Sequence, residues 1–361
     1  MKRKFLLIPL LCMPFLLASC DLRIQRQVTK EVVTVEGDEI EVMRIKNSIT
    51  DVYNLVSPSC VGLYCTSDMV ASIGSGVIYK YLDGYYYVVT NHHVIDGKTD
   101  FKVYDGIKTY YDATLIGSDA TNDVAVLKFS TDVLGEFRDF KPMEILSNDV
   151  SDTLTIGQTV VAVGCPLDIE NYNSVTSGII SRFTREQITT DAALNPGNSG
   201  GGLFNMEGRL VGLVNSGMVW TQSENGNVPV EGEGYAISLY ILKASIRDIE
   251  EKQTSFTRPL MGIRVFTVNT LLGGESYEKV KDYLPSGEGE NSYVVIAEVT
   301  MDSPAYKAGL LANDVILTIN DEKIYKTAQI GEILHVLTNS SSLTVVVYRS
   351  GTLQTINLSF E

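Results

Sequence analysis

Three short stretches hold side chains that together could activate a serine for attack on a carbonyl carbon. The stretch "LNPGNSGGGLF", 194–204, places Ser199 in a run of glycines. Two adjacent histidines, His92 and His93, lie in "TNHHV", and Asp123 opens the apolar run "DVAVLKF". A serine hydroxyl needs a base to take its proton, and histidine is the usual base at neutral pH. A carboxylate beside the histidine holds its tautomer and orientation.

Each stretch alone has a simpler interpretation. An aspartate before an apolar strand is more often a solvated cap or turn residue, and adjacent histidines are more often surface or core residues. Glycine-rich turns are also common. The conjunction of all three, in the chain order His, Asp, Ser, favours a catalytic triad. The third histidine, His335, lies far along the chain and is predicted to be a surface or groove-edge residue.

The segments around these residues predict a chain that is mainly β. From Cys60 to Ser238, short alternating or apolar runs recur between glycine, asparagine and aspartate, which is typical of sandwiches or barrels. A helix over "YILKASIRDIEEKQ" closes this region. A second region, 258–361, holds strands such as "SYVVIAEVT" and helices near "ESYEKVKDYL" and "TAQIGEILHVLT". A shorter helix before Pro58 precedes the first strand.

The motifs "TNHHV", "NDVAVLK" and "TDAALNPGNSGG" resemble those of HtrA/Deg-type trypsin-like serine proteases with one C-terminal PDZ domain. The resemblance implies a chymotrypsin-like double β-barrel over 47–252, followed by a small α+β PDZ domain over 258–361. It also implies that His93 is the base, because the histidine of this motif directly precedes Val94. Asp123 would orient it and Ser199 would be the nucleophile, while the role of His92 stays open.

The same resemblance assigns the surroundings of the nucleophile. The backbone N–H groups of Gly197 and Ser199 would form an oxyanion hole, for which glycine permits the necessary backbone angles. Substrate would add as a strand along "LVNSG", facing Val214, Asn215 and Ser216. A small apolar pocket near Leu194 and Val214 would favour small aliphatic residues. Asp191 belongs to the "TDAA" motif and is not interpreted as a pocket base.

The second region carries a predicted site for peptide C-termini. "RPLMGIRV" resembles the carboxylate-binding loop and first groove strand of PDZ domains, with Leu260, Met261, Gly262 and Ile263 beside the bound peptide. The helix predicted over 327–337 would form the other wall of the groove. The alternative is that its apolar stripe serves only the core, which is expected for about half of those positions.

The N-terminus predicts export and a lipid anchor. Lys2, Arg3 and Lys4 precede an apolar run about half as long as a membrane-spanning helix, as in a secretory signal. The run ends in "LASC", which resembles a bacterial lipobox and implies lipidation of Cys20 after removal of 1–19. Residues 20–46 would then be a tether, with an alternating stretch that could end in a strand. The alternative is an ordinary signal or short anchor with an incidental cysteine.

Charge and cysteine content exclude other classes of partner. The net charge of −15 repels phosphate backbones, so we expect no nucleic acid partner. Cys60 and Cys65 lie in one extended run on opposite faces, too far apart for a disulfide. With Cys165 they are predicted to be small buried hydrophobes. We expect neither a metal nor a cofactor.

The sequence therefore predicts a lipid-anchored endopeptidase of the bacterial cell envelope that acts on misfolded or regulatory proteins. The resemblance also implies a homotrimer. An alternative is a peptide-binding quality-control factor whose catalytic site is held in an inactive shape. The segment "ISRFTREQITTDAALN" is shorter than a loop that carries signals between subunits in many family members. An acidic loop around Trp220 would either cover the pocket or be a solvated insertion.

Overall fold

The computed structural model describes residues 28–35, 38–45, 48–107, 109–131, 139–147, 153–216, 220–223, 226–229, 232–271, 274–285, 292–338 and 341–360. Over 28–45 and 220–229 it describes only the backbone. The predicted signal segment and Cys20 lie outside these residues, as does the side chain of Trp220. The chain divides into two units, Met1–Ser48 and Ile49–Glu361. None of the described helices is long and apolar enough to cross a membrane.

The described part of the first unit is a β-hairpin. Strand β1 (Val28–Val35) pairs antiparallel with β2 (Asp38–Ile45). The alternating stretch "EVVTVEGDEIEVMRI" covers most of both strands. The sequence therefore forms two strands here, where one was expected.

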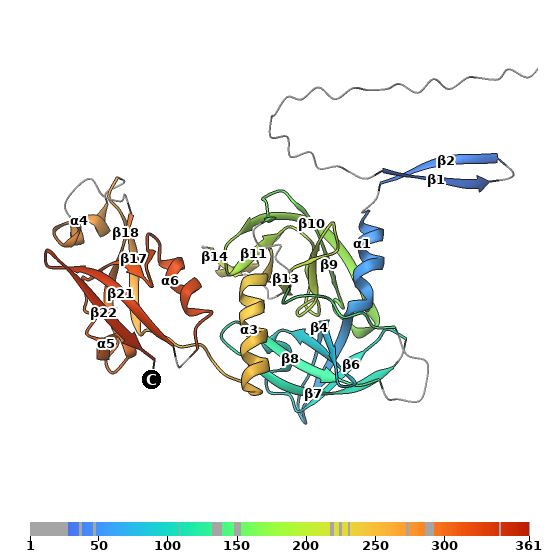
Figure 1. Cartoon of the computed structure of the whole chain (residues 1–361), viewed down its shortest axis with the longest axis horizontal. Helices are drawn as coiled ribbons and strands as arrows, with labels where there is room; N and C mark the ends of the chain where they lie inside the picture. Colours follow the sequence, from blue (N-terminus) through green and yellow to red (C-terminus); the bar gives the residue numbers. More distant parts are fainter. Residues whose placement is uncertain are drawn as a thin grey trace, which may run out of the picture. The chain divides into compact units, whose positions relative to one another are not determined.

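The second unit begins with helix α1 (Ile49–Val56) and a 3-10 turn, Ser57–Ser59, that contains Pro58. A six-stranded closed barrel follows, in the order β3-β4-β5-β8-β7-β6. Figure 1 labels β4, β6, β7 and β8 of this barrel. Its strands are β3 (Cys60–Thr66), β4 (Ala71–Leu82), β5 (Tyr85–Thr90), β6 (Asp100–Tyr104), β7 (Tyr110–Asp119) and β8 (Val124–Phe129). Aromatic side chains, including Tyr111 and Phe129, fill part of its interior.

A second closed barrel has the strand order β10-β11-β16-β13-β12-β9. Its strands are β9 (Thr159–Gly164), β10 (Ser174–Phe183), β11 (Gln187–Thr190), β12 (Gly202–Asn205), β13 (Leu210–Asn215) and β16 (Gly234–Ser238). A separate hairpin, β14 (Trp220–Ser223) and β15 (Gly226–Pro229), occupies the acidic loop. Strands β6, β11 and β12 were not predicted, because each is short and gains its partners only when its barrel closes.

Helix α3 (Leu239–Lys252) packs against strands of both barrels, including β7 and β13 (Figure 1). Its first turn is capped by Ser238, whose hydroxyl accepts a hydrogen bond from the Ile241 N–H. One apolar core joins the second barrel to α1, α3 and the facing side of the first barrel. Cys60, Cys65 and Cys165 are buried, as the sequence predicted.

The C-terminal region folds around a sheet in the order β17-β18-β19-β21-β22, with β20 paired to β19. Its strands are β17 (Ile263–Asn269), β18 (Ser292–Val299), β19 (Val315–Ile319), β20 (Glu322–Lys323), β21 (Ser342–Arg349) and β22 (Thr352–Ser359). Its helices are α4 (Glu275–Val280), α5 (Pro304–Ala308) and α6 (Thr327–Leu334). Strand β17 is an edge strand, and the Thr327 N–H at the start of α6 bonds the Thr267 hydroxyl on it, 3.3 Å away.

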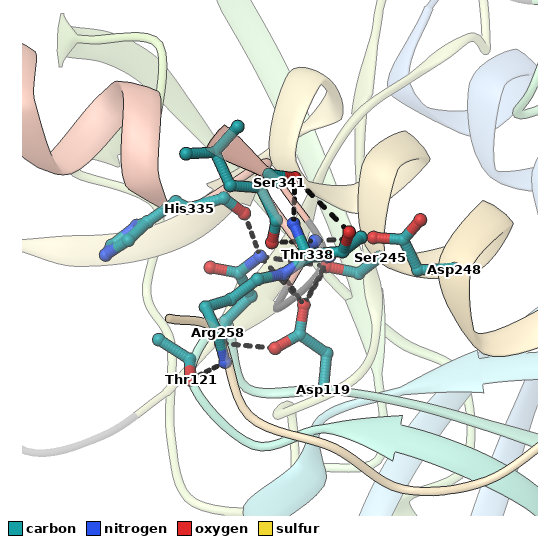
Figure 2. Close-up of polar contacts among 10 residues, drawn as sticks. Asp119, Thr121, Ser245, Asp248, Arg258, His335, Thr338 and Ser341 are labelled. Atoms are coloured by element: carbon teal, nitrogen blue, oxygen red, sulfur yellow. Dashed lines mark hydrogen bonds and ion pairs between the residues drawn. The ribbon is translucent and has the colours of Figure 1, made fainter. Parts of the chain in front are cut away.

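A buried polar cluster joins the end of α6 to the turn after β7 (Figure 2). Arg258 Nε donates to Asp119 Oδ2 at 2.7 Å, and another guanidinium nitrogen donates to the Leu337 carbonyl at 2.9 Å. Asn122 Nδ2 donates both to Asp119 Oδ2, at 2.9 Å, and to the His335 carbonyl, at 2.7 Å. The residues that follow α6 are thus bonded to the turn that leads into β8.

Candidate active site

The structure brings His93 and Asp123 together. His93 lies in a single helical turn, α2 (His92–Ile95), directly after β5, and Asp123 ends the turn between β7 and β8. His93 Nδ1 lies 2.7 Å from Asp123 Oδ2, and the His93 backbone N–H donates to Asp123 Oδ1 at 2.8 Å. With Nδ1 protonated towards the carboxylate, Nε2 keeps the lone pair that a base needs.

Two asparagines hold Asp123 in place, one at its carboxylate and one at its backbone carbonyl, and neither was predicted to do so. Asn215 Nδ2 donates to Asp123 Oδ2 at 3.0 Å, and Asn91 Nδ2 donates to the Asp123 carbonyl at 2.9 Å. Asp123 itself has a left-handed backbone angle, φ 55°, which aspartate tolerates better than most residues. Asn91 could have been found from its place inside "TNHHV", but nothing in the sequence links Asn215 to Asp123.

His92 points to a different part of the fold. Its Nδ1 lies 3.0 Å from the Ser118 hydroxyl, which donates in turn to the Ser255 hydroxyl at 3.0 Å. Successive residues of a helical turn diverge by roughly 100°, because a turn takes about 3.6 residues. The helical turn therefore separates the two adjacent imidazoles, and only His93 contacts Asp123.

The serine loop contains two backbone N–H groups, those of Gly197 and Ser199, that its own hydrogen bonds leave unused. The Pro196 carbonyl accepts from the Leu167 N–H at 2.7 Å, and the Asn198 carbonyl accepts from the Gly201 N–H at 2.9 Å. Because peptide bonds are trans, the N–H groups of Gly197 and Ser199 point away from those carbonyls. Neither donates a hydrogen bond to any residue that the structure describes. Both stay available for an oxyanion.

Position 197 requires glycine because of its backbone φ angle and because there is no room for a Cβ atom. Its φ is 98°, and a Cβ atom there would lie 2.3 Å from the Cys165 carbonyl oxygen. Ser75 of the first barrel fixes the same loop, since its hydroxyl donates to the Gly197 carbonyl at 2.7 Å and its N–H donates to the Ser199 carbonyl at 2.8 Å. Ser75 lies in "GSGVI", but its role was not predicted.

The hydroxyl of Ser199 bonds to Ser216. The two hydroxyl oxygens are 2.7 Å apart, and the Ser216 N–H donates to Ser199 Oγ at 3.2 Å. Within the part of the chain that the structure describes, no hydrogen bond joins Ser199 to His93. The histidine and aspartate are therefore assembled, and the serine hydroxyl is directed elsewhere.

Comparison with known proteins identifies the family. Residues 74–213 match the model of a trypsin-like peptidase domain, and 259–360 match that of a PDZ domain. The chain is 32% identical over 360 residues to "Serine protease Do-like HtrA" of Lactococcus lactis subsp. cremoris (strain MG1363), covering 94% of this chain and 84% of that one. The chain belongs to the HtrA family of serine proteases.

Two further relatives agree with this assignment. "Probable periplasmic serine endoprotease DegP-like" of Marinomonas sp. (strain MWYL1) is 33% identical over 299 residues, which cover 81% of this chain and 57% of that one. The solved structure "HtrA-type protease AlgW with tripeptide" is 29% identical and superposes with a TM-score of 0.66, covering 86% of this chain and 96% of that one. The predicted fold is confirmed: two six-stranded barrels of the chymotrypsin type are followed by a PDZ domain.

In this HtrA protein, one residue of the predicted substrate-binding strand already has its backbone groups hydrogen-bonded within the barrel. Val214 is buried, its N–H donates to the Gly201 carbonyl at 2.8 Å, and its carbonyl accepts from the Gly200 N–H at 2.9 Å. Both backbone groups of Val214 are therefore already bonded, and its place facing the substrate backbone stays a prediction. Leu194 lies against Gly234, where an added Cβ would come within 2.6 Å of Leu194 Cδ1. A side chain at 234 would therefore require the Leu194 side chain to shift.

The predicted carboxylate loop of the PDZ domain has free donors. The N–H groups of Leu260, Met261 and Gly262 donate to no residue that the structure describes, whereas the carbonyls of Met261 and Gly262 accept from Ala305 and Thr300. Gly262 has φ 77°, and a Cβ atom there would lie 2.2 Å from Ser303 Cβ. Leu260 is exposed, and Met261 is part of the core.

The turn between β10 and β11 contacts the PDZ domain. Arg185 pairs with Glu322 at 3.2 Å, and Glu186 lies 3.4 Å from His335 Nδ1. Burial raises the pKa of the Glu186 carboxyl, and His335 opposes that shift. His335 is thus a contact residue between the two domains. The sequence predicted it as a surface or groove-edge residue. The short turn reaches the PDZ domain within the same chain.

Proposed function

We propose that this HtrA protease cuts peptide bonds with His93 as base, Asp123 as the acid that orients it, and Ser199 as nucleophile. The observation that carries the proposal is the pair of hydrogen bonds from His93 to Asp123, at 2.7 and 2.8 Å, beside a serine loop with two unused N–H groups. A protease of this type needs a base, an orienting carboxylate and oxyanion donors in one place.

The proposed reaction begins when the Ser199 hydroxyl rotates from Ser216 towards His93. Ser199 Oγ attacks the carbonyl carbon, and His93 Nε2 takes the hydroxyl proton. The N–H groups of Gly197 and Ser199 bind the negative oxygen of the tetrahedral intermediate. His93 then protonates the leaving amine, and water releases the acyl group from Ser199 through the same base.

Substrate recognition is proposed at two places. A substrate strand would pair with the segment at Asn215 and Ser216, and a small aliphatic side chain would enter the pocket beside Leu194. Exposed C-termini of proteins would bind the PDZ domain along Ile263, with the carboxylate at the N–H groups of Leu260, Met261 and Gly262. The free donors of that loop support this assignment. We infer misfolded or regulatory proteins as substrates, and a homotrimer as the assembly.

The proposed location is outside the cytoplasm. Residues 1–19 would act as a lipoprotein signal, Cys20 would carry the lipid, and 20–46 would tether the protease to the bacterial membrane. The basic residues, the apolar run and the "LASC" stretch at the N-terminus support the lipoprotein signal. The DegP-like relative is called periplasmic, which supports a location outside the cytoplasm.

The protease assignment is tested with unfolded casein and a small fluorophosphonate. We expect the mature protein to degrade casein, and the reagent to stop degradation by modifying Ser199, as mapped by mass spectrometry. A second candidate function is peptide binding without turnover, which the bond between Ser199 and Ser216 favours. Suppressed casein aggregation without cleavage or labelling would support that second function and contradict the first.

The lipid anchor is tested by Cys20→Ser. We expect the variant to lose its attached lipid and to leave the membrane fraction, because one thioether-linked lipid group is the proposed anchor. The measurement is membrane fractionation with mass spectrometry of the N-terminus. A variant that stays in the membrane, together with a wild-type protein that carries no lipid, would contradict the anchor.

A further inference from the structure

The hydroxyl of Ser199 has a defined partner other than the base. Ser199 and Ser216 are both buried, with 5% and 8% of their surfaces exposed, so water competes little for this contact. Ser199 Oγ accepts the Ser216 N–H at 3.2 Å and shares a 2.7 Å hydrogen bond with the Ser216 hydroxyl. Two hydrogen bonds from one residue therefore hold the hydroxyl oxygen of the nucleophile.

The other groups of the proposed site are already arranged as the reaction needs. Both oxygens of Asp123 bond His93, and the Gly197 and Ser199 N–H groups are unused. The backbone at Ser199 is fixed, because its carbonyl accepts from the Ser75 N–H at 2.8 Å and the next residue bonds Val214. With the backbone bonded in place, the hydroxyl can change its partner by rotation about the Ser199 Cα–Cβ bond, between staggered positions.

We propose that Ser216 is a positioning residue that holds the Ser199 hydroxyl in a resting orientation away from His93. This inference rests on the proposed role of Ser199 as nucleophile. Ser216 follows Asn215, whose side chain holds Asp123, so consecutive residues at the end of β13 contact the acid and the nucleophile. The observed reaction rate is the intrinsic rate multiplied by the fraction of molecules in which Ser199 faces His93.

The test is Ser216→Ala, which removes one of the two hydrogen bonds that hold Ser199. We expect the second-order rate of phosphonylation by a small uncharged fluorophosphonate to rise about two- to tenfold, as the loss of one net hydrogen bond allows. In this reaction the Ser199 Oγ–phosphorus bond forms, fluoride leaves and His93 takes the proton. The probe and casein share only Ser199 as the reacting group. With casein, a rise in kcat with little change in KM would therefore show the same effect on the nucleophile.

Ser216→Thr is the matched control, because it keeps a hydroxyl at the same position. Its labelling rate should stay well below that of Ser216→Ala, because its hydroxyl can still bond Ser199. A purely steric effect would instead push the rate of this bulkier variant below that of the wild type. An unchanged or slower rate for Ser216→Ala would overturn the inference. Failure of the wild-type protein to be labelled at Ser199 would instead contradict the proposed nucleophile, so the two failures are distinguishable.

A second measurement needs no variant. A high-resolution crystal structure of the unliganded wild-type protein should place Ser199 Oγ within hydrogen-bond distance of Ser216 Oγ. Full occupancy of an orientation bonded to His93 Nε2 would overturn the inference, even if Ser216→Ala did not fold.

Discussion

Replacing His93 with alanine is expected to lower kcat/KM for casein by about 10⁴- to 10⁶-fold, the range found when one member of a triad is removed. His93 is the imidazole bonded to Asp123, at 2.7 Å, so its loss removes the only proposed acceptor for the Ser199 proton. The measurement is initial cleavage rate at saturating and limiting casein, with circular dichroism to verify the fold.

His92→Ala is the matched control, since it removes the same side chain one residue earlier. His92 bonds Ser118 instead of Asp123, so this variant should keep most of its activity. The opposite outcome, a dead His92 variant and an active His93 variant, would show that the assignment is shifted by one residue. Equal and complete loss in both would indicate that the helical turn itself, and not one imidazole, is needed.

Replacing Arg258 with alanine is expected to destabilise the protein by about 3–5 kcal/mol, because it leaves a buried carboxylate without its charged partner. Asp119 is fully buried, and Arg258 Nε donates to its Oδ2 at 2.7 Å. The loss also removes the bond to the Leu337 carbonyl after α6. Calorimetry should show a fall in melting temperature of roughly 6–20 °C, at about 2–4 °C per kcal/mol.

Arg185→Ala gives the matched comparison, since Arg185 also pairs with a carboxylate of the other domain. Its partner is Glu322, at 3.2 Å, and both side chains are exposed. An exposed pair contributes about 0–1 kcal/mol, so the melting temperature of this variant should barely change. Equal shifts for the two variants would refute the argument that burial of Asp119 makes the difference.

The sequence predicted the fold class, which the structure confirms, and it singled out His93, Asp123 and Ser199 as the proposed triad. Both predictions depend on local patterns. "TNHHV", "DVAVLKF" and the serine loop each carry a residue type that the chemistry needs and a backbone motif that presents it. Alternating apolar runs predicted most of the barrel strands, since each such run buries one face. The short strands β6, β11 and β12 were missed because their stability comes from pairing on both sides, which a short segment does not reveal.

Only the tertiary structure could decide what surrounds those residues. Asn215 holds Asp123 from 92 positions away, Ser75 braces a loop that lies more than 120 positions further along, and Arg258 bonds Asp119 across 139 positions. The bond between Ser199 and Ser216 likewise depends on how β13 lies against the serine loop. Sequence by itself identified the groups that are proposed to react. Closure of the barrels decided their partners, because hydrogen bonds between distant segments exist only once both segments are packed in place.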